Sequence, residues 1–120
     1  MALDDEITKA IGAHGMWKNR LRSAIDNGKA DANPADVAKD NACPFGQWLY
    51  GATIPGASRN GANYGSVRKL HADFHRCASK VLECVSAGDK TKANALMAGE
   101  YAKVSGDLTA AMMKWKAAGV

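Results

Sequence analysis

The most constraining feature of the sequence is the spacing of its apolar residues, which alternates between steps of four and three near both ends of the chain. An α-helix has 3.6 residues per turn, so this spacing places the apolar residues on one helical face. No segment shows the sustained alternation of a half-buried strand. The sequence therefore predicts an all-α fold. The two stripes are Leu3, Ile7, Ala10, His14, Trp17, Leu21, Ala24 and Met97, Tyr101, Val104, Leu108, Ala111, Trp115.

Capping residues divide the chain into helices. The first helix is predicted over 3–26, because Gly28 supplies a left-handed residue at its end. Asn33 precedes Pro34, a pair typical of a helix start, and predicts a short helix over 34–39. By the same reasoning Cys43 caps another short helix that begins at Pro44.

Residues 51–65 carry four glycines and one proline, which predicts a long surface loop. Two further long helices are expected, one over 64–86 and one from about residue 89. Short connections between long helices favour antiparallel neighbours. We therefore predict an antiparallel four-helix bundle with a short, broken second helix and a long Gly-rich loop before the third.

Length and composition limit the class of protein. The 120 residues are 47% hydrophobic and 23% charged, which predicts one domain over 1–120. No apolar run approaches the roughly 20 residues of a membrane span, so membrane insertion is not expected. Acidic residues at positions 4–6 (DDE) argue against a signal peptide and favour the cytoplasm. The net charge is +4, but the basic residues are scattered, which argues against nucleic-acid binding.

The three cysteines cannot all be paired within one chain. Cys77 and Cys84 are seven residues apart on one predicted helix, about 10.5 Å along its axis. A disulfide tolerates at most about 7 Å between Cα atoms. We therefore interpret these two cysteines as inert packing residues with reduced thiols, as in the cytoplasm.

The three histidines form the strongest functional signal. His71 and His75 are four residues apart, so their rings project from one helical face, and His14 lies on the core stripe of the first helix. Burying an imidazole without a partner costs about 1–3 kcal/mol. A shared metal ion would satisfy all three rings together.

Cys43 is the best candidate for a fourth ligand, because a helix N-terminus favours the thiolate that metals require. Three nitrogens and one sulfur indicate Zn²⁺. Four protein ligands leave no position for a reactive water, so the chain is not expected to be an enzyme. A zincin protease is disfavoured because residues 71–75 (HADFH) lack the glutamate of His-Glu-x-x-His. A hemerythrin-like iron site would need more histidines than three.

These residues resemble those of the chemoreceptor zinc-binding (CZB) domain family. The resemblance rests on His14 with Trp17-Lys18, on residues 43–49 (CPFGQWL) and on residues 71–75, and it extends over about residues 5–116. It implies a bacterial cytoplasmic four-helix bundle that binds one zinc ion. Carried over, the ligands are His14, Cys43, His71 and His75, the same four that the helical faces indicate.

The resemblance also implies a sensory role. CZB domains are attached to chemoreceptors or diguanylate cyclases, so a chemotaxis or cyclic-di-GMP output partner is expected. The implied signal is zinc or an oxidant such as hypochlorous acid, with Cys43 as the redox switch. Oxidation to a sulfenic acid makes the sulfur a poorer ligand, which should loosen zinc and rearrange residues 40–50. A purely structural zinc site in a protein-interaction module is the alternative.

Other residues receive simpler interpretations. Trp17 and Trp48 are expected to pack in the core near the metal, and Asp40 and Asp73 to be solvated surface acids rather than partners of the ligand histidines. The outer face of the last helix is small and nearly uncharged, which predicts a homodimer through that helix. That face comprises Gly99, Ala102, Gly106, Thr109, Ala110 and Met113.

Overall fold

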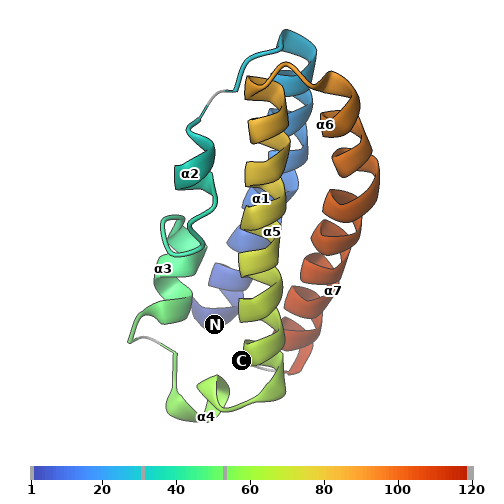
Figure 1. Cartoon of the computed structure of the whole chain (residues 1–120). Helices are drawn as coiled ribbons and strands as arrows, with labels where there is room; N and C mark the ends of the chain where they lie inside the picture. The colour runs from blue at the N-terminus through green and yellow to red at the C-terminus, as the bar shows by residue number, and fades with distance from the viewer. Residues whose placement is uncertain (1, 31, 53, 119–120) are drawn as a thin grey trace.

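The computed structural model describes residues 2–30, 32–52 and 54–118, and these residues form helices and connections with no strand among them (Figure 1). The predicted all-α class is confirmed. A π-helical turn, η1, joins the last two α-helices. The elements are α1 (Ala2–Asn27), α2 (Pro34–Val37), α3 (Pro44–Tyr50), α4 (Gly56–Arg59), α5 (Ala62–Ser86), α6 (Lys90–Leu96), η1 (Met97–Tyr101) and α7 (Ala102–Ala118).

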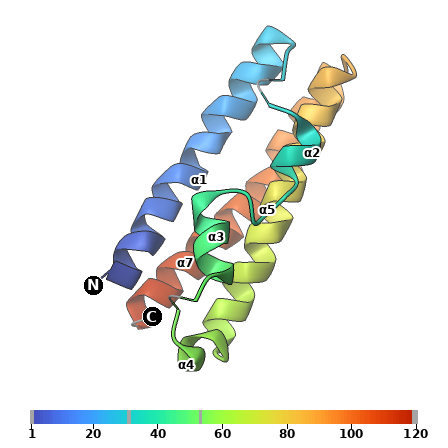
Figure 2. The same cartoon turned by 90° about the vertical axis from the view of Figure 1, so that its left-hand side faces the viewer.

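The long helices lie side by side in an elongated body of 46 × 22 × 20 Å. Helices α1 and α5 run in the same direction, and α6–α7 return in the opposite one (Figure 1). The short α2 and α3 lie one after the other along the side of α1 and α5 (Figure 2). Helix α5 contacts α1, α2, α6 and α7, so it is the central element of the fold.

The predicted capping residues of three helices lie where the structure has them. Gly28 and Gly88 have positive φ angles of 68° and 76°, the left-handed conformation that glycine adopts at little cost. The side chain of Asn33 accepts a hydrogen bond from the Ala35 N–H at the start of α2. Helix α2 is shorter than predicted, because it ends at Val37 instead of residue 39.

The segment over 51–65 is more structured than the predicted loop. It contains α4, and α5 begins at Ala62, two residues earlier than expected. Ile54 is only 2% exposed and anchors the segment in the core. The Arg59 side chain donates a hydrogen bond of 3.1 Å to the Ile54 carbonyl, which closes the turn. The glycines and the proline here mark helix starts as well as turns.

The last helical segment follows its predicted stripe only in part. Met97, Tyr101, Leu108 and Trp115 are buried, whereas Val104 and Ala111 are half-buried. Met112 is fully buried in place of Ala111. Successive residues of an α-helix are about 100° apart around the axis, so Met112 lies about 40° from Leu108, whereas Ala111 lies about 60° from it.

Candidate metal centre

Four side chains from three separate parts of the chain converge on one point. His14 of α1, Cys43 before α3, and His71 and His75 of α5 each offer one donor atom, and these atoms lie within 4.8 Å of one another. The His71 Nε2 atom is 3.1 Å from the Nε2 atoms of both His14 and His75. It is 3.3 Å from Cys43 Sγ. The structure thus brings together all four residues predicted from the sequence.

Local structure explains how Cys43 reaches the centre. Cys43 is the N-cap of α3, as predicted, and its Sγ accepts a hydrogen bond of 3.3 Å from the Gly46 N–H. The backbone of Asp40 folds against Gly46 so closely that a Cβ atom there would lie 1.7 Å from the Asp40 carbonyl oxygen. Glycine at position 46 is therefore required for the turn that presents the sulfur.

The segment that carries Cys43, over residues 34–50, is held against helix α5 by side chains of α5 that contact its backbone carbonyls. Tyr64 donates its hydroxyl hydrogen to the Leu49 carbonyl at 2.7 Å, and Ser79 donates to the Pro34 carbonyl at 2.7 Å. His75 Nδ1 lies 2.9 Å from the Val37 carbonyl. These contacts fix the position of the segment that carries Cys43 along two thirds of α5.

Burial sets the protonation of the histidines. His71 is 0% exposed, His75 3% and His14 5%. Burial lowers the pKa of His14 to about 4 and the pKa of His71 to about 2, and it also lowers the pKa of His75. All three rings are therefore neutral at pH 7, which is the form that binds metal ions.

The tautomers direct lone pairs to the centre. His14 Nδ1 is 2.7 Å from the Ala10 carbonyl, and His75 Nδ1 faces the Val37 carbonyl. A carbonyl only accepts hydrogen bonds, so both Nδ1 atoms carry the proton and both Nε2 atoms expose lone pairs. A proton on His71 Nε2 satisfies only one of them. A cation at the common point would bind the lone pairs of all three Nε2 atoms and of Cys43 Sγ, so these residues fit a metal ion, and the proton of His71 would then lie on Nδ1, which is buried without a hydrogen-bond partner in the described part of the chain.

The groups that orient His14 and His75 are backbone carbonyls, which leave no motif in the sequence. Asp40 instead accepts a hydrogen bond from the Tyr50 hydroxyl. Asp73 pairs with Arg76 on the outside of α5. Both acids bond to residues other than the ligand histidines, and both are half-buried rather than fully solvated as predicted.

The expectation for the Cys43 thiol was incomplete. The N-cap hydrogen bonds do lower its pKa, but burial raises it by more, so the pKa of the free thiol lies above its ordinary value. The sequence indicated that Cys43 lies at a helix N-terminus, but it did not indicate that the thiol is partly buried, which is the cause of the raised pKa. A cation at the centre is therefore needed to stabilise the thiolate.

Aromatic rings enclose the centre. Phe45 lies edge-on to His71, with centroids 5.1 Å apart, and Phe74 lies edge-on to His14 at 5.1 Å. Trp17 borders His75 at 6.4 Å, and Trp48 stacks on Phe45 at 5.5 Å. Both tryptophans pack against the core near the centre, as predicted, but each is half-buried. This apolar shell lowers the local dielectric constant, which strengthens interactions between a cation and its ligands.

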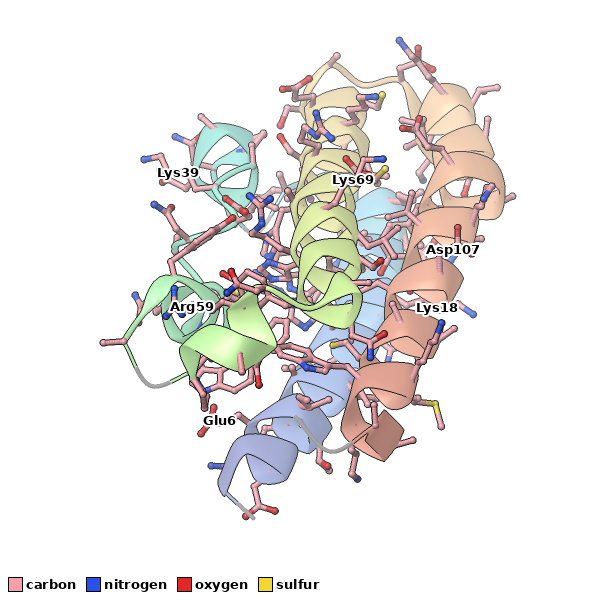
Figure 3. The ribbon with its side chains drawn as sticks, turned by 90° about the horizontal axis from the view of Figure 1, so that it is seen from below. Glu6, Lys18, Lys39, Arg59, Lys69 and Asp107 are labelled. Carbon is pink, nitrogen blue, oxygen red and sulfur yellow. The ribbon has the colours of Figure 1, made fainter. Side chains whose placement is uncertain are left out.

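Charged side chains are spread around the outside of the molecule. Lys18, Lys39, Lys69 and Asp107 come from different elements and point away from the interior (Figure 3). Among the described residues, no helix is both long and apolar enough to span a bilayer.

The structure is an all-helical domain whose cluster of three nitrogen donors and one sulfur donor could hold a metal ion, and this set of donors is typical of zinc sites. The family model of the chemoreceptor zinc-binding domain matches residues 14–82, which include all four donor residues and more than half of the chain. The chain therefore belongs to the chemoreceptor zinc-binding domain family. No curated protein and no solved structure matches it.

Proposed function

We propose that this chain is a bacterial cytoplasmic regulatory domain that binds one Zn²⁺ ion through His14, Cys43, His71 and His75. The observation that carries the proposal is the convergence of neutral, buried donor atoms whose lone pairs have no other common partner. Bound zinc would link α1, α5 and the segment before α3, elements that are far apart in the sequence. Gain or loss of the ion would therefore change how these elements pack.

The proposed signals are zinc and oxidants such as hypochlorous acid, with Cys43 as the redox switch. The Cys43 thiolate attacks the chlorine of hypochlorous acid, which forms a sulfenyl chloride and releases hydroxide. Water then displaces chloride from the sulfur and gives a sulfenic acid. Cys43 is the half-buried donor, whereas the three histidines are almost completely enclosed, so an oxidant meets the sulfur first. The oxidised sulfur would bind metal poorly, and the segment over 34–50 would then be held to α5 mainly by the hydrogen bonds of its Pro34, Val37 and Leu49 carbonyls.

Metal analysis of the purified protein tests the site, and zinc release into a chromogenic chelator tests the switch. We expect about one zinc per chain and release of zinc on addition of hypochlorous acid. The Cys43→Ala variant should show no oxidant-triggered release. Iron or no metal in the purified protein would contradict the zinc site, and equal release from both proteins would contradict the switch.

A structural zinc site in an interaction module is a second candidate, favoured by the position of the ligands within the core. His71 and Phe74 are both 0% exposed and belong to the same packed interior. Hydrogen exchange after zinc removal separates the two functions. A regulatory site predicts loss of protection near residues 34–50 alone, and a structural site predicts loss along the whole of α5.

We further propose that the domain has no catalytic activity of its own and passes its signal to a chemotaxis or cyclic-di-GMP output protein. Four protein donors fill a tetrahedral shell and leave no vertex for a reactive water. The arrangement is best described as a single domain over 1–120, an antiparallel four-helix bundle in which α2 and α3 form the broken second helix. The scattered basic residues do not favour nucleic acid as a partner.

We also propose that the domain forms a homodimer, in which the outer face of α7 contacts a second copy of the chain. Met113 is 59% exposed there, and a Cβ atom added to Gly106 would have nothing within 4 Å. Packing within the chain therefore does not require a glycine at position 106. A helix of a second copy that packs closely against α7 would require a small residue there. Sedimentation should show a dimer that Gly106→Arg converts to a monomer. A wild-type monomer at high concentration would contradict this interface.

A further inference from the structure

A hollow of about 460 Å³ opens to solvent between α5 and the segment that carries α2 and α3, which lies beside α5 (Figure 2). The segment contributes Ala38 and Tyr50 to the lining, and α5 contributes residues between Gly65 and Arg76. The four metal-donor residues are not among the described residues that line it. The hollow is therefore a surface feature separate from the metal centre, although the two share the same segment as a wall.

The lining of this hollow carries more positive than negative charge. Three cations and one carboxylate border it: Arg68, Lys69, Arg76 and Asp73. Arg76 forms an ion pair with Asp73 on the same helix. Arg68 and Lys69 are exposed, and neither has an ion pair with a described residue. Two positive charges at the hollow are therefore available to an anionic partner.

The cations are spread along α5 above a floor of small residues. Arg68, Ala72 and Arg76 recur every four residues, so they share one side of the helix, and the two arginines are about 12 Å apart along its axis. A Cβ atom added to Gly65, at one end of this floor, would meet nothing within 4 Å. An occupant that meets both ends must carry anionic groups spread over a similar length. A helix with acidic residues at intervals of four has this spacing, whereas neighbouring phosphates of a nucleotide are much closer together.

The opposite wall of the hollow carries an exposed aromatic ring. The Tyr50 side chain is 45% exposed, and its hydroxyl is already engaged with the Asp40 carboxylate. Tyrosine and arginine are both enriched at the surfaces through which proteins bind one another. A tyrosine that lines an open hollow together with two arginines therefore favours a protein segment over a small anion.

We propose that this hollow is the docking site for an acidic helical segment of the output protein. The inference rests on the proposed function, in which the domain passes its signal to such a protein. Carboxylates of the segment pair with Arg68 and Lys69, and its apolar side chains pack against Tyr50 and Ala72. Charge complementarity of this kind sets the specificity and the rate of association.

The wall of the hollow is attached to a proposed zinc ligand. Ala38 lines the hollow, and the carbonyl of the preceding residue, Val37, lies 2.9 Å from His75 Nδ1. A shift of the His75 ring on loss of zinc would therefore move the wall against α5 and change the width of the hollow. We expect the zinc-bound form to bind the acidic segment more tightly than the zinc-free form.

NMR titration of the zinc-loaded full chain tests the docking site. The probe is an alanine-based helical peptide with glutamates at every fourth position, and a matched peptide carries glutamines instead. We expect the glutamate peptide to shift the backbone amide signals of Gly65, Lys69 and Ala72, and the glutamine peptide to shift them much less. Added salt should weaken the binding, because the paired charges are exposed.

Two matched pairs of charge variants test the residues. Arg68→Gln/Lys69→Gln should weaken binding of the glutamate peptide about fivefold, as expected for two exposed charge contacts. Lys18→Gln/Lys114→Gln removes the same charge from exposed positions on α1 and α7 and should leave the binding unchanged. Equal weakening by the two pairs would overturn the docking site, because it would show attraction to the net charge alone.

Two glycine variants test the floor. A Cβ atom at either Gly65 or Gly12 would meet nothing within 4 Å, so Gly65→Leu and Gly12→Leu should both fold. Only Gly65→Leu fills the hollow, and only this variant should bind the peptide more weakly. Equal affinity of the two variants would overturn the placement of the segment. Displacement of the peptide by a lower concentration of pyrophosphate would identify a phosphate ligand and overturn the acidic segment.

The zinc-free protein separates this inference from the proposed function. We expect weaker binding of the glutamate peptide after a chelator removes zinc, while the amide signals of α7 show that the chain remains folded. Equal binding with and without zinc would contradict regulation by zinc and leave the docking site in place. No shift of the Gly65, Lys69 and Ala72 signals in the zinc-loaded protein would overturn the docking site and leave zinc binding unaffected.

Discussion

Two parts of the same core are built on different principles. Near the α5–α6 connection the interior is aliphatic, with Leu21, Ile25, Val81 and Leu82 each 0–2% exposed. Around the centre, equally buried positions hold three imidazoles that make their contacts through nitrogen atoms. The aliphatic part gains its stability from burial of apolar surface, which needs no ligand. The histidine part has imidazole nitrogens whose lone pairs a bound cation would accept, so only this part is expected to gain stability when a metal ion binds.

The largest expected difference between the two parts comes from His71→Ala. His71 Nε2 contacts all three other donor atoms, so its loss leaves an incomplete ligand set. Removing even a partner that only orients a ligand costs about 10- to 100-fold in metal affinity, and we expect a loss of at least about 100-fold here. Competition with a zinc chelator measures it. Zinc affinity equal to that of the wild type would show that the four residues are not the site.

Leu82→Ala is the matched change in the aliphatic part. Leu82 is 0% exposed, and its truncation should lower the free energy of unfolding by about 2–5 kcal/mol. Zinc affinity should stay within about threefold of the wild type, because no ligand or orienting carbonyl is touched. Denaturant unfolding and the same chelator competition give both values. A large loss of zinc affinity would show that the two parts are not separable.

Acid should weaken the zinc-free protein through the histidine part. Burial holds the pKa of His14 at about 4 and that of His71 at about 2, below the unfolded value of 6.5. The unfolded chain therefore binds more protons below pH 6.5, and stability falls with falling pH. Between pH 7 and pH 5 we expect a loss of about 2–4 kcal/mol. Denaturant unfolding at several pH values measures it, and His71→Ala should show a shallower slope.

The sequence predicted features that depend on neighbouring residues and missed those that depend on tertiary contact. His71 and His75 were identified by helical spacing, and Cys43 by its place before a proline, both of which are local rules. The carbonyls of Ala10 and Val37 were missed because any residue supplies a carbonyl. The turn η1 was missed for a related reason, since a π-helical turn depends on packing against α5.

The smallest expected effects come from two glycines, one beside the centre and one far from it. Gly46→Ala would place a Cβ atom against the Asp40 carbonyl, so we expect a loss of about 1–3 kcal/mol in stability and weaker zinc binding through displaced Cys43. Gly106→Ala adds a methyl group to an open helical position and should raise monomer stability by about 0.5–1 kcal/mol without affecting zinc. Thermal unfolding and chelator competition on both variants measure the contrast. If Gly46→Ala left zinc affinity unchanged, the tight turn before α3 would not be what positions the Cys43 sulfur. The two parts of the core would then differ in the residues that they contain, but neither would depend on an exact backbone conformation.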